Sequence, residues 1–72
     1  MDIIDFDLDR EYVALNDLLH LVGVVDTGGM GKALVASGAV EVDGETELRK
    51  TAKIRAGQVV RVEEVEIRVR GG

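Results

Sequence analysis

The chain has 72 residues, of which 46% are hydrophobic and 32% charged, and its formal net charge is −5. A chain of this length forms one small core, so we expect residues 1–72 to make a single domain. The lack of cysteine excludes disulfides and thiolate metal sites. No apolar run is long enough to span a membrane, and the acidic first residues do not fit a cationic signal peptide. We expect a cytoplasmic monomer that makes no membrane contact.

The charges are unevenly distributed along the chain. Residues 1–26 carry seven acids and one base, whereas residues 27–62 carry six bases and four acids. An acidic protein with a basic middle segment can still present one face to a polyanion, although its long-range field opposes the approach.

The first predicted elements are a strand and a helix. Residues 4–8 alternate between apolar side chains and aspartates, which predicts a strand with one buried face. Asp9 is the predicted N-cap of the helix, and Gly23 ends it. The apolar stripe of this helix comprises Leu15, Leu18, Leu19 and Val22.

A second helix, a strand and a tight turn follow within eighteen residues. Thr27 is the predicted N-cap, Gly38 the stop, and residues 40–42 the strand before the Asp43-Gly44 turn. Glycines at positions 28, 29 and 31 weaken a helix, so they need a reason. Close backbone packing and an anion site at the helix start are both open, and we favour packing.

The remaining chain predicts further strands. Residues 45–57 are expected to form a returning strand or an ordered loop. Residues 58–63 and 65–70 alternate cleanly around a turn at Glu63-Glu64. The predicted fold class is therefore α+β, with two short helices packed on a small, mostly antiparallel sheet.

Several residue patterns resemble metal, nucleotide or catalytic sites, but each lacks a residue that such a site needs. The aspartates of residues 5–9 do not begin a calcium loop, because Arg10 stands where a glycine is needed. His20 has no second ligand, and Gly31-Lys32 is not a P-loop because Ala33 follows it. Ser37 has no base at a readable spacing. We expect no catalytic residues, no metal site, no cofactor and no enzymatic activity.

The order of these features resembles the αL RNA-binding motif, the S-four-type domain, and especially its small stand-alone bacterial members. The resemblance spans residues 15–62 and lies in Leu15-x-x-Leu18-Leu19, Thr27 at the helix cap, Leu34-Val35 before Gly38, Val40-x-Val42-Asp43-Gly44, Glu47 to Ile54, and Gly57-x-Val59. Gly28 and Gly31 depart from the arginine and alanine that the family often has, which removes one expected phosphate contact.

The resemblance implies binding to structured RNA, ribosomal or transfer RNA, without DNA binding. The residues expected to contact RNA are Thr27, Lys32, Arg49, Lys50, Lys53 and Arg55. Lys and Arg pair strongly with phosphate, whereas two aromatic residues offer little for stacking on single-stranded bases.

An alternative class is suggested by the C-terminal Gly71-Gly72, which is similar to the tail of ubiquitin-like proteins and sulfur carriers. In such carriers the terminal glycine is adenylated and then thiocarboxylated or conjugated. The carrier fold has no second helix before its Val-x-Val strand, whereas residues 27–37 are predicted to be helical. We favour RNA binding.

Overall fold

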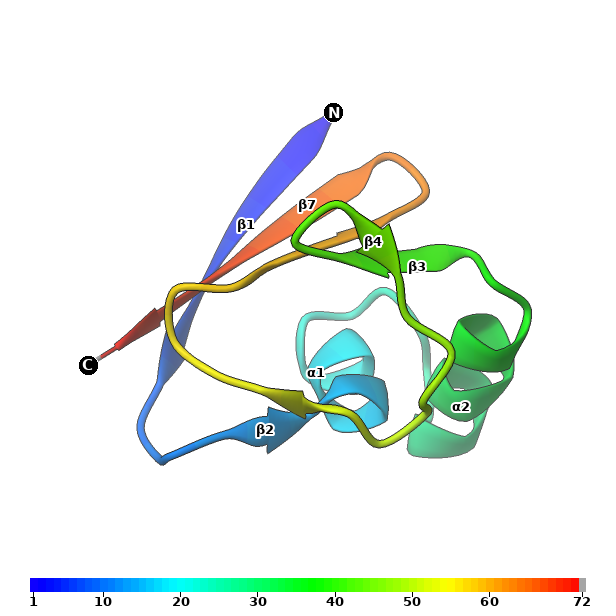
Figure 1. Ribbon diagram of the computed structural model, residues 1–72, viewed down its shortest axis with the longest axis horizontal. Coiled ribbons are helices and arrows are strands. Elements are labelled where there is room, and N and C mark those ends of the chain that lie inside the picture. The colour runs from blue at the N-terminus through cyan, green and yellow to red at the C-terminus, as the bar shows by residue number, and fades with distance from the viewer. Residues whose placement is uncertain (72) are drawn as a thin grey trace.

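A computed structural model of the protein describes residues 1–71. Two helices lie against a five-stranded sheet, and two further short strands pair with each other in a separate ribbon (Figure 1). The large sheet has the order β1 (Asp2–Leu8), β7 (Val65–Gly71), β6 (Val59–Val62), β3 (Val40–Val42) and β4 (Glu45–Thr46). The ribbon pairs β2 (Val13–Ala14) with β5 (Lys53–Ile54), and the helices are α1 (Leu15–Leu21) and α2 (Gly28–Ala36). Within residues 1–71, no helix has the length and apolar character needed to cross a membrane.

An aliphatic core joins the helices to the sheet. Its fully buried side chains are Leu15, Leu18, Leu19, Val35, Val40, Ile54, Val60, Val62 and Ile67. The stripe predicted for the first helix and the alternation predicted for the last strands both lie in this core. The α+β fold class is confirmed.

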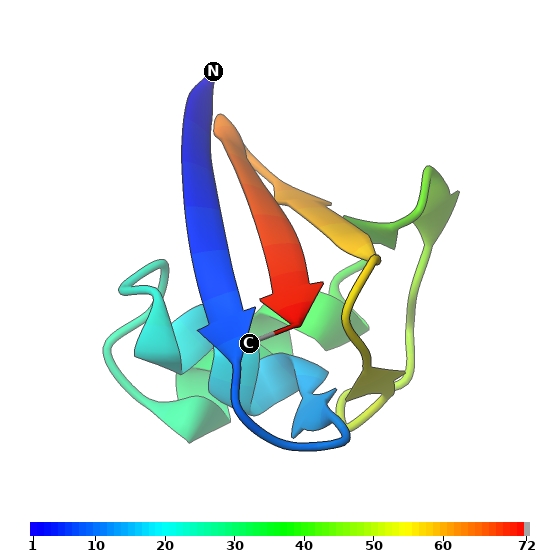
Figure 2. The same ribbon diagram turned by 90° about the vertical axis from the view of Figure 1, so that its left-hand side faces the viewer.

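The sheet is mixed, because its first and last strands pair in parallel. Asp2 aligns with Val65, and Leu8 aligns with Gly71. Figure 2 shows the two strands side by side and running in the same direction. The other three pairings in this sheet are antiparallel, as predicted.

The predicted start of the first helix was wrong. Asp9 does not cap it; its carboxylate contacts the neighbouring Arg10 at 3.2 Å. The helix begins at Leu15, and its N-cap residue, Ala14, makes no side-chain capping bond. The predicted stop was correct, since Gly23 follows the helix with a φ of 83°.

The second helix and the turns follow the sequence prediction. The Thr27 hydroxyl accepts a hydrogen bond from the Met30 amide at 3.1 Å, so Thr27 is the N-cap. Asp43 and Gly44 have φ values of 52° and 85°, as a two-residue hairpin turn requires. Helix α2 packs on α1 through Gly31. An added Cβ at Gly31 would lie 2.7 Å from the Asn16 carbonyl oxygen. Packing therefore accounts for this glycine.

Candidate functional site

Four cationic side chains line one open groove beside α2. Lys32 comes from α2, and Arg49, Lys50 and Lys53 come from the segment between β4 and β5. The groove has a volume of about 870 Å³, and its floor and walls also include Leu48, Thr51 and Ala52. The fold thus brings together four of the six predicted site residues.

The segment that carries three of these cations is held by main-chain hydrogen bonds. The first two amides of α1 donate to it: the Leu15 amide to the Ala52 carbonyl at 2.9 Å, and the Asn16 amide to the Lys50 carbonyl at 3.1 Å. At the other end, the Glu47 amide donates to the Val40 carbonyl at 2.9 Å. These bonds satisfy helix amides that lack a side-chain cap, and they fix the segment against the core.

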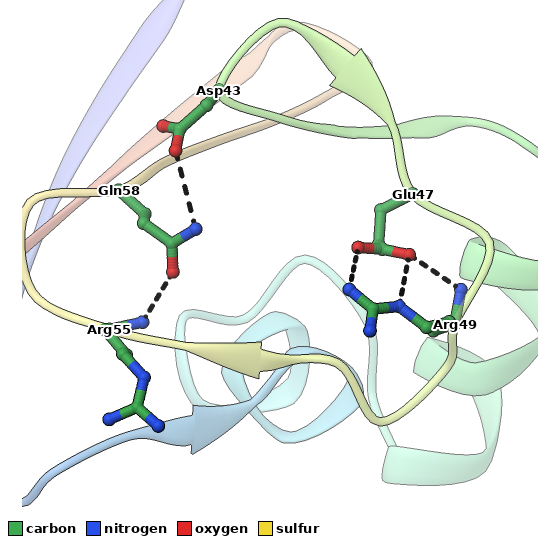
Figure 3. Close-up of polar contacts among 5 residues, drawn as sticks. All are labelled: Asp43, Glu47, Arg49, Arg55 and Gln58. Carbon is green, nitrogen blue, oxygen red and sulfur yellow. Dashed lines mark hydrogen bonds and ion pairs between the residues drawn. The ribbon is translucent and has the colours of Figure 1, made fainter.

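Glu47 and Arg49 form an ion pair with two side-chain hydrogen bonds in this segment (Figure 3). The two carboxylate oxygens of Glu47 accept from the Arg49 guanidinium at 3.0 and 3.1 Å, and one also accepts from the Arg49 amide. These hydrogen bonds lower the pKa of Glu47. Glu47 therefore orients Arg49 and partly neutralises it.

The three lysines of the groove are not neutralised in this way. Among residues 1–71, Lys32, Lys50 and Lys53 make no ion pair with a carboxylate. All three are exposed. An ammonium group without a carboxylate partner remains available to an anionic ligand.

Two predicted site residues lie outside the groove lining. Arg55 follows β5, and its guanidinium donates to the carboxylate of Glu11, which precedes β2, at 3.2 Å. Its amide donates to the Gln58 side chain at 2.7 Å, and Gln58 in turn contacts Asp43 (Figure 3). The hydroxyl of Thr27 is used as the helix cap.

The sequence of residues 6–70 matches the family model of the S4 domain. The chain belongs to the S4 domain family.

Relatives of this S4 domain include two proteins whose names bear on function and one whose name does not. "Putative RNA-binding protein YbcJ" of Escherichia coli (strain K12) is 49% identical over 49 residues, which cover 68% of this chain and 70% of YbcJ. "Probable ribosome maturation protein RlbA" of Bacillus subtilis (strain 168) is 34% identical over 56 residues, covering 78% and 79% of the two chains. "Uncharacterized protein YbcJ" of Shigella flexneri matches at 49% identity over the same length and shares.

The solution structure of E. coli YbcJ has the same fold. It superposes with a TM-score of 0.74 at 38% sequence identity, covering 97% of this chain and 90% of YbcJ. That structure is described as revealing an ALFAL motif involved in RNA-binding. Family membership and the presence of α2 both disfavour the carrier alternative. Gly71 belongs to β7, and Gly72 lies outside the described residues.

One feature of this S4 domain was missed by sequence reasoning. Tyr12 stands beside the groove, with its ring centroid 5.0 Å from the Lys53 ammonium and 5.8 Å from the Arg55 guanidinium carbon. Its proximity depends on the pairing of β2 with β5, two strands of two residues each. Such short strands give almost no periodic signal.

Proposed function

We propose that this S4 domain binds structured RNA, ribosomal or transfer RNA, through the phosphate backbone. The observation that carries the proposal is the groove itself, where a helix and a distant segment contribute Lys32, Arg49, Lys50 and Lys53 to one surface. The names of the E. coli and B. subtilis relatives support RNA binding and a ribosomal context.

The charges of the groove favour phosphate as the ligand group. Within residues 1–71, three lysines without carboxylate partners and one arginine line the groove. Arg49, Lys50 and Lys53 lie on a segment whose backbone is held by hydrogen bonds, so little backbone ordering is required on binding. Lysine contacts to phosphate position a nucleic acid without reading its bases. Double-stranded RNA is recognised mainly by its shape and backbone, which suits a surface of this kind.

Binding rather than catalysis fits the remaining side chains. His20, the single histidine, is exposed on α1. Within residues 1–71, no group of three or more His, Cys, Asp and Glu side chains is placed to hold a metal ion. We infer an RNA-binding protein that is not an enzyme.

A matched pair of charge reversals tests the groove. Lys50→Glu should weaken binding to a ribosomal RNA helix by roughly tenfold at low salt, because one attractive phosphate contact becomes repulsive. Arg70→Glu changes the net charge by the same amount on β7, outside the groove, and should alter affinity less than about twofold. Fluorescence anisotropy of labelled RNA gives the affinities, and thermal melting checks that both variants fold. Equal losses for the two variants would contradict a localised site.

A further inference from the structure

The aromatic residue nearest the groove is Tyr12, just before β2. The chain has one phenylalanine, one tyrosine and no tryptophan. Phe6 packs against the core, whereas Tyr12 lies outside the core cluster and is 39% exposed. Tyr12 is therefore the aromatic ring that a ligand can reach.

The ring of Tyr12 lies next to the cationic groove, in a separate shallow pocket that is also lined by Glu11 and Asp17. Lys53 lines the groove and also places its ammonium over the ring at 5.0 Å. Arg55 directly follows β5, and its guanidinium carbon lies 5.8 Å from the ring centroid. The ring and the groove thus share Lys53, which places the ring within reach of a ligand that extends past Lys53.

The ribbon determines which face the Tyr12 side chain shares. In the pairing of β2 with β5, Val13 aligns with Ile54 and both are buried, whereas Ala14 aligns with the exposed Lys53. Side chains alternate between the two faces of a strand, so Tyr12 shares the outward face with Ala14. An aromatic side chain beside cations is the arrangement on which proteins stack nucleic-acid bases.

We propose that Tyr12 is a stacking platform for one unpaired base, so that the preferred ligand is an RNA duplex interrupted by a bulged or loop nucleotide. The proposal rests on the proposed function and specifies the RNA. Duplex phosphates occupy the lysine groove, and a base next to the duplex reaches the ring. Bases inside a continuous duplex are already stacked on both faces and cannot do so. When a base covers the ring, the Lys53 ammonium contacts the adjacent phosphate.

A different role for Tyr12 makes a different prediction. If the ring served only to position Lys53 and Arg55, its loss would weaken the binding of every RNA to the same extent. A stacking platform instead affects the RNA with an unpaired base and leaves the continuous duplex nearly unchanged. The ratio of the two affinities separates these roles.

The experiment uses two RNAs, a continuous ribosomal-type duplex and the same duplex with one unpaired adenosine. Wild-type protein should bind the bulged RNA more tightly. Tyr12→Leu should weaken binding to the bulged RNA by roughly tenfold and to the continuous duplex by less than about twofold, whereas Tyr12→Phe should retain the preference. Because the chain has one tyrosine and no tryptophan, its intrinsic emission reports on this ring. The bulged RNA should quench that emission more than the continuous duplex does.

Three outcomes would overturn the proposal. Equal weakening of both RNAs by Tyr12→Leu would assign the ring to cation positioning. Equal quenching by both RNAs, with no wild-type preference, would show that no base stacks on it. In both cases Lys50→Glu would still weaken binding, so RNA binding itself would stand. If wild-type protein bound neither RNA, the proposed function would fail as well.

Discussion

At the residue scale, Gly31 shows how one missing side chain sets the spacing of two helices. A Cβ at this position would lie 2.7 Å from the Asn16 carbonyl oxygen and 3.2 Å from its Cα. Backbone atoms cannot move aside as a flexible side chain can, so α1 and α2 would have to separate. The close approach buries Asn16, which is only 6% exposed.

Gly31→Ala should therefore lower the free energy of unfolding by about 1–3 kcal/mol. Gly29→Ala is the matched control, because its nearest neighbour to an added Cβ is the Thr27 hydroxyl at 3.8 Å. That variant should be neutral or stabilised by up to about 1 kcal/mol through helix propensity. Urea unfolding followed by circular dichroism measures both. If Gly31→Ala had the same free energy of unfolding as wild type, the spacing of the helices would not depend on the absence of a side chain at this position.

Glu66 is a charged residue that the fold buries. It is 6% exposed and lies between Arg68, at 2.7 Å, and Arg61, at 2.8 Å. Hydrogen bonds from Arg68 and then from Arg61 lower the pKa of Glu66 below its ordinary value of 4.5. Alternation alone placed Glu66 on the outer face of the strand, and it did not indicate that two arginines cover it.

The stability that Glu66 contributes should depend on pH. Because its pKa is lower in the folded state, this contribution is complete above about pH 4.5 and is lost as the pH falls through the folded-state pKa. Glu66→Gln should lower the melting temperature at neutral pH, and the difference from wild type should shrink in acid. The exposed neighbour Glu64→Gln provides the control. A difference that did not change with pH would point to packing instead of charge.

At the element scale, α1 explains the largest error of the sequence prediction. Its stripe of leucines was visible in the sequence, but its start was not. Asp9 is a good cap by residue type, yet the first amides of the helix bind the carbonyls of Ala52 and Lys50 instead. A cap supplied by a segment so far along the chain leaves no local pattern. By contrast, the Thr27 cap and the Asp43-Gly44 turn are formed by neighbouring residues and were predicted correctly.

The hairpin at Asp43 gives a test at this scale. The Asp43 carboxylate accepts from the Val59 amide at 2.9 Å and contacts the Gln58 side chain at 3.4 Å. Asp43 also has a positive φ of 52°, which aspartate and asparagine tolerate better than alanine. Asp43→Ala should destabilise the protein by about 1–2 kcal/mol, and Asp43→Asn by clearly less. Thermal unfolding distinguishes the variants; identical melting curves would mean that the turn forms without this side chain.

At the scale of the whole molecule, the cationic groove was accessible from sequence only through the family resemblance. Lys32 and Lys50 are separated along the chain, and periodicity does not bring them together. The resemblance predicted a shared surface, and the fold assembles it with Lys53. It did not predict that Arg55 would pair with Glu11, because that contact depends on the pairing of β2 with β5.

The net charge of −5 around a positive groove makes affinity sensitive to salt. Three to five phosphate contacts predict that log affinity falls with log salt concentration with a slope of about −2.7 to −4.5. Lys50→Glu should make the slope shallower by about 1, since one phosphate contact is lost. Titrations at several potassium concentrations measure the slope. An affinity independent of salt would rule out binding through phosphate.

The parallel pairing of β1 with β7 has a consequence for synthesis. β1 cannot pair with β7 until β7, which lies much later in the chain, has also left the ribosome. Until then the alternating apolar side chains of residues 4–8 are exposed on a nascent peptide. Asp5 and Asp7, interleaved among them, are the kind of charge that prevents such a segment from joining other chains. We therefore expect Asp5 and Asp7 to keep the unpaired β1 segment from associating with other chains during translation.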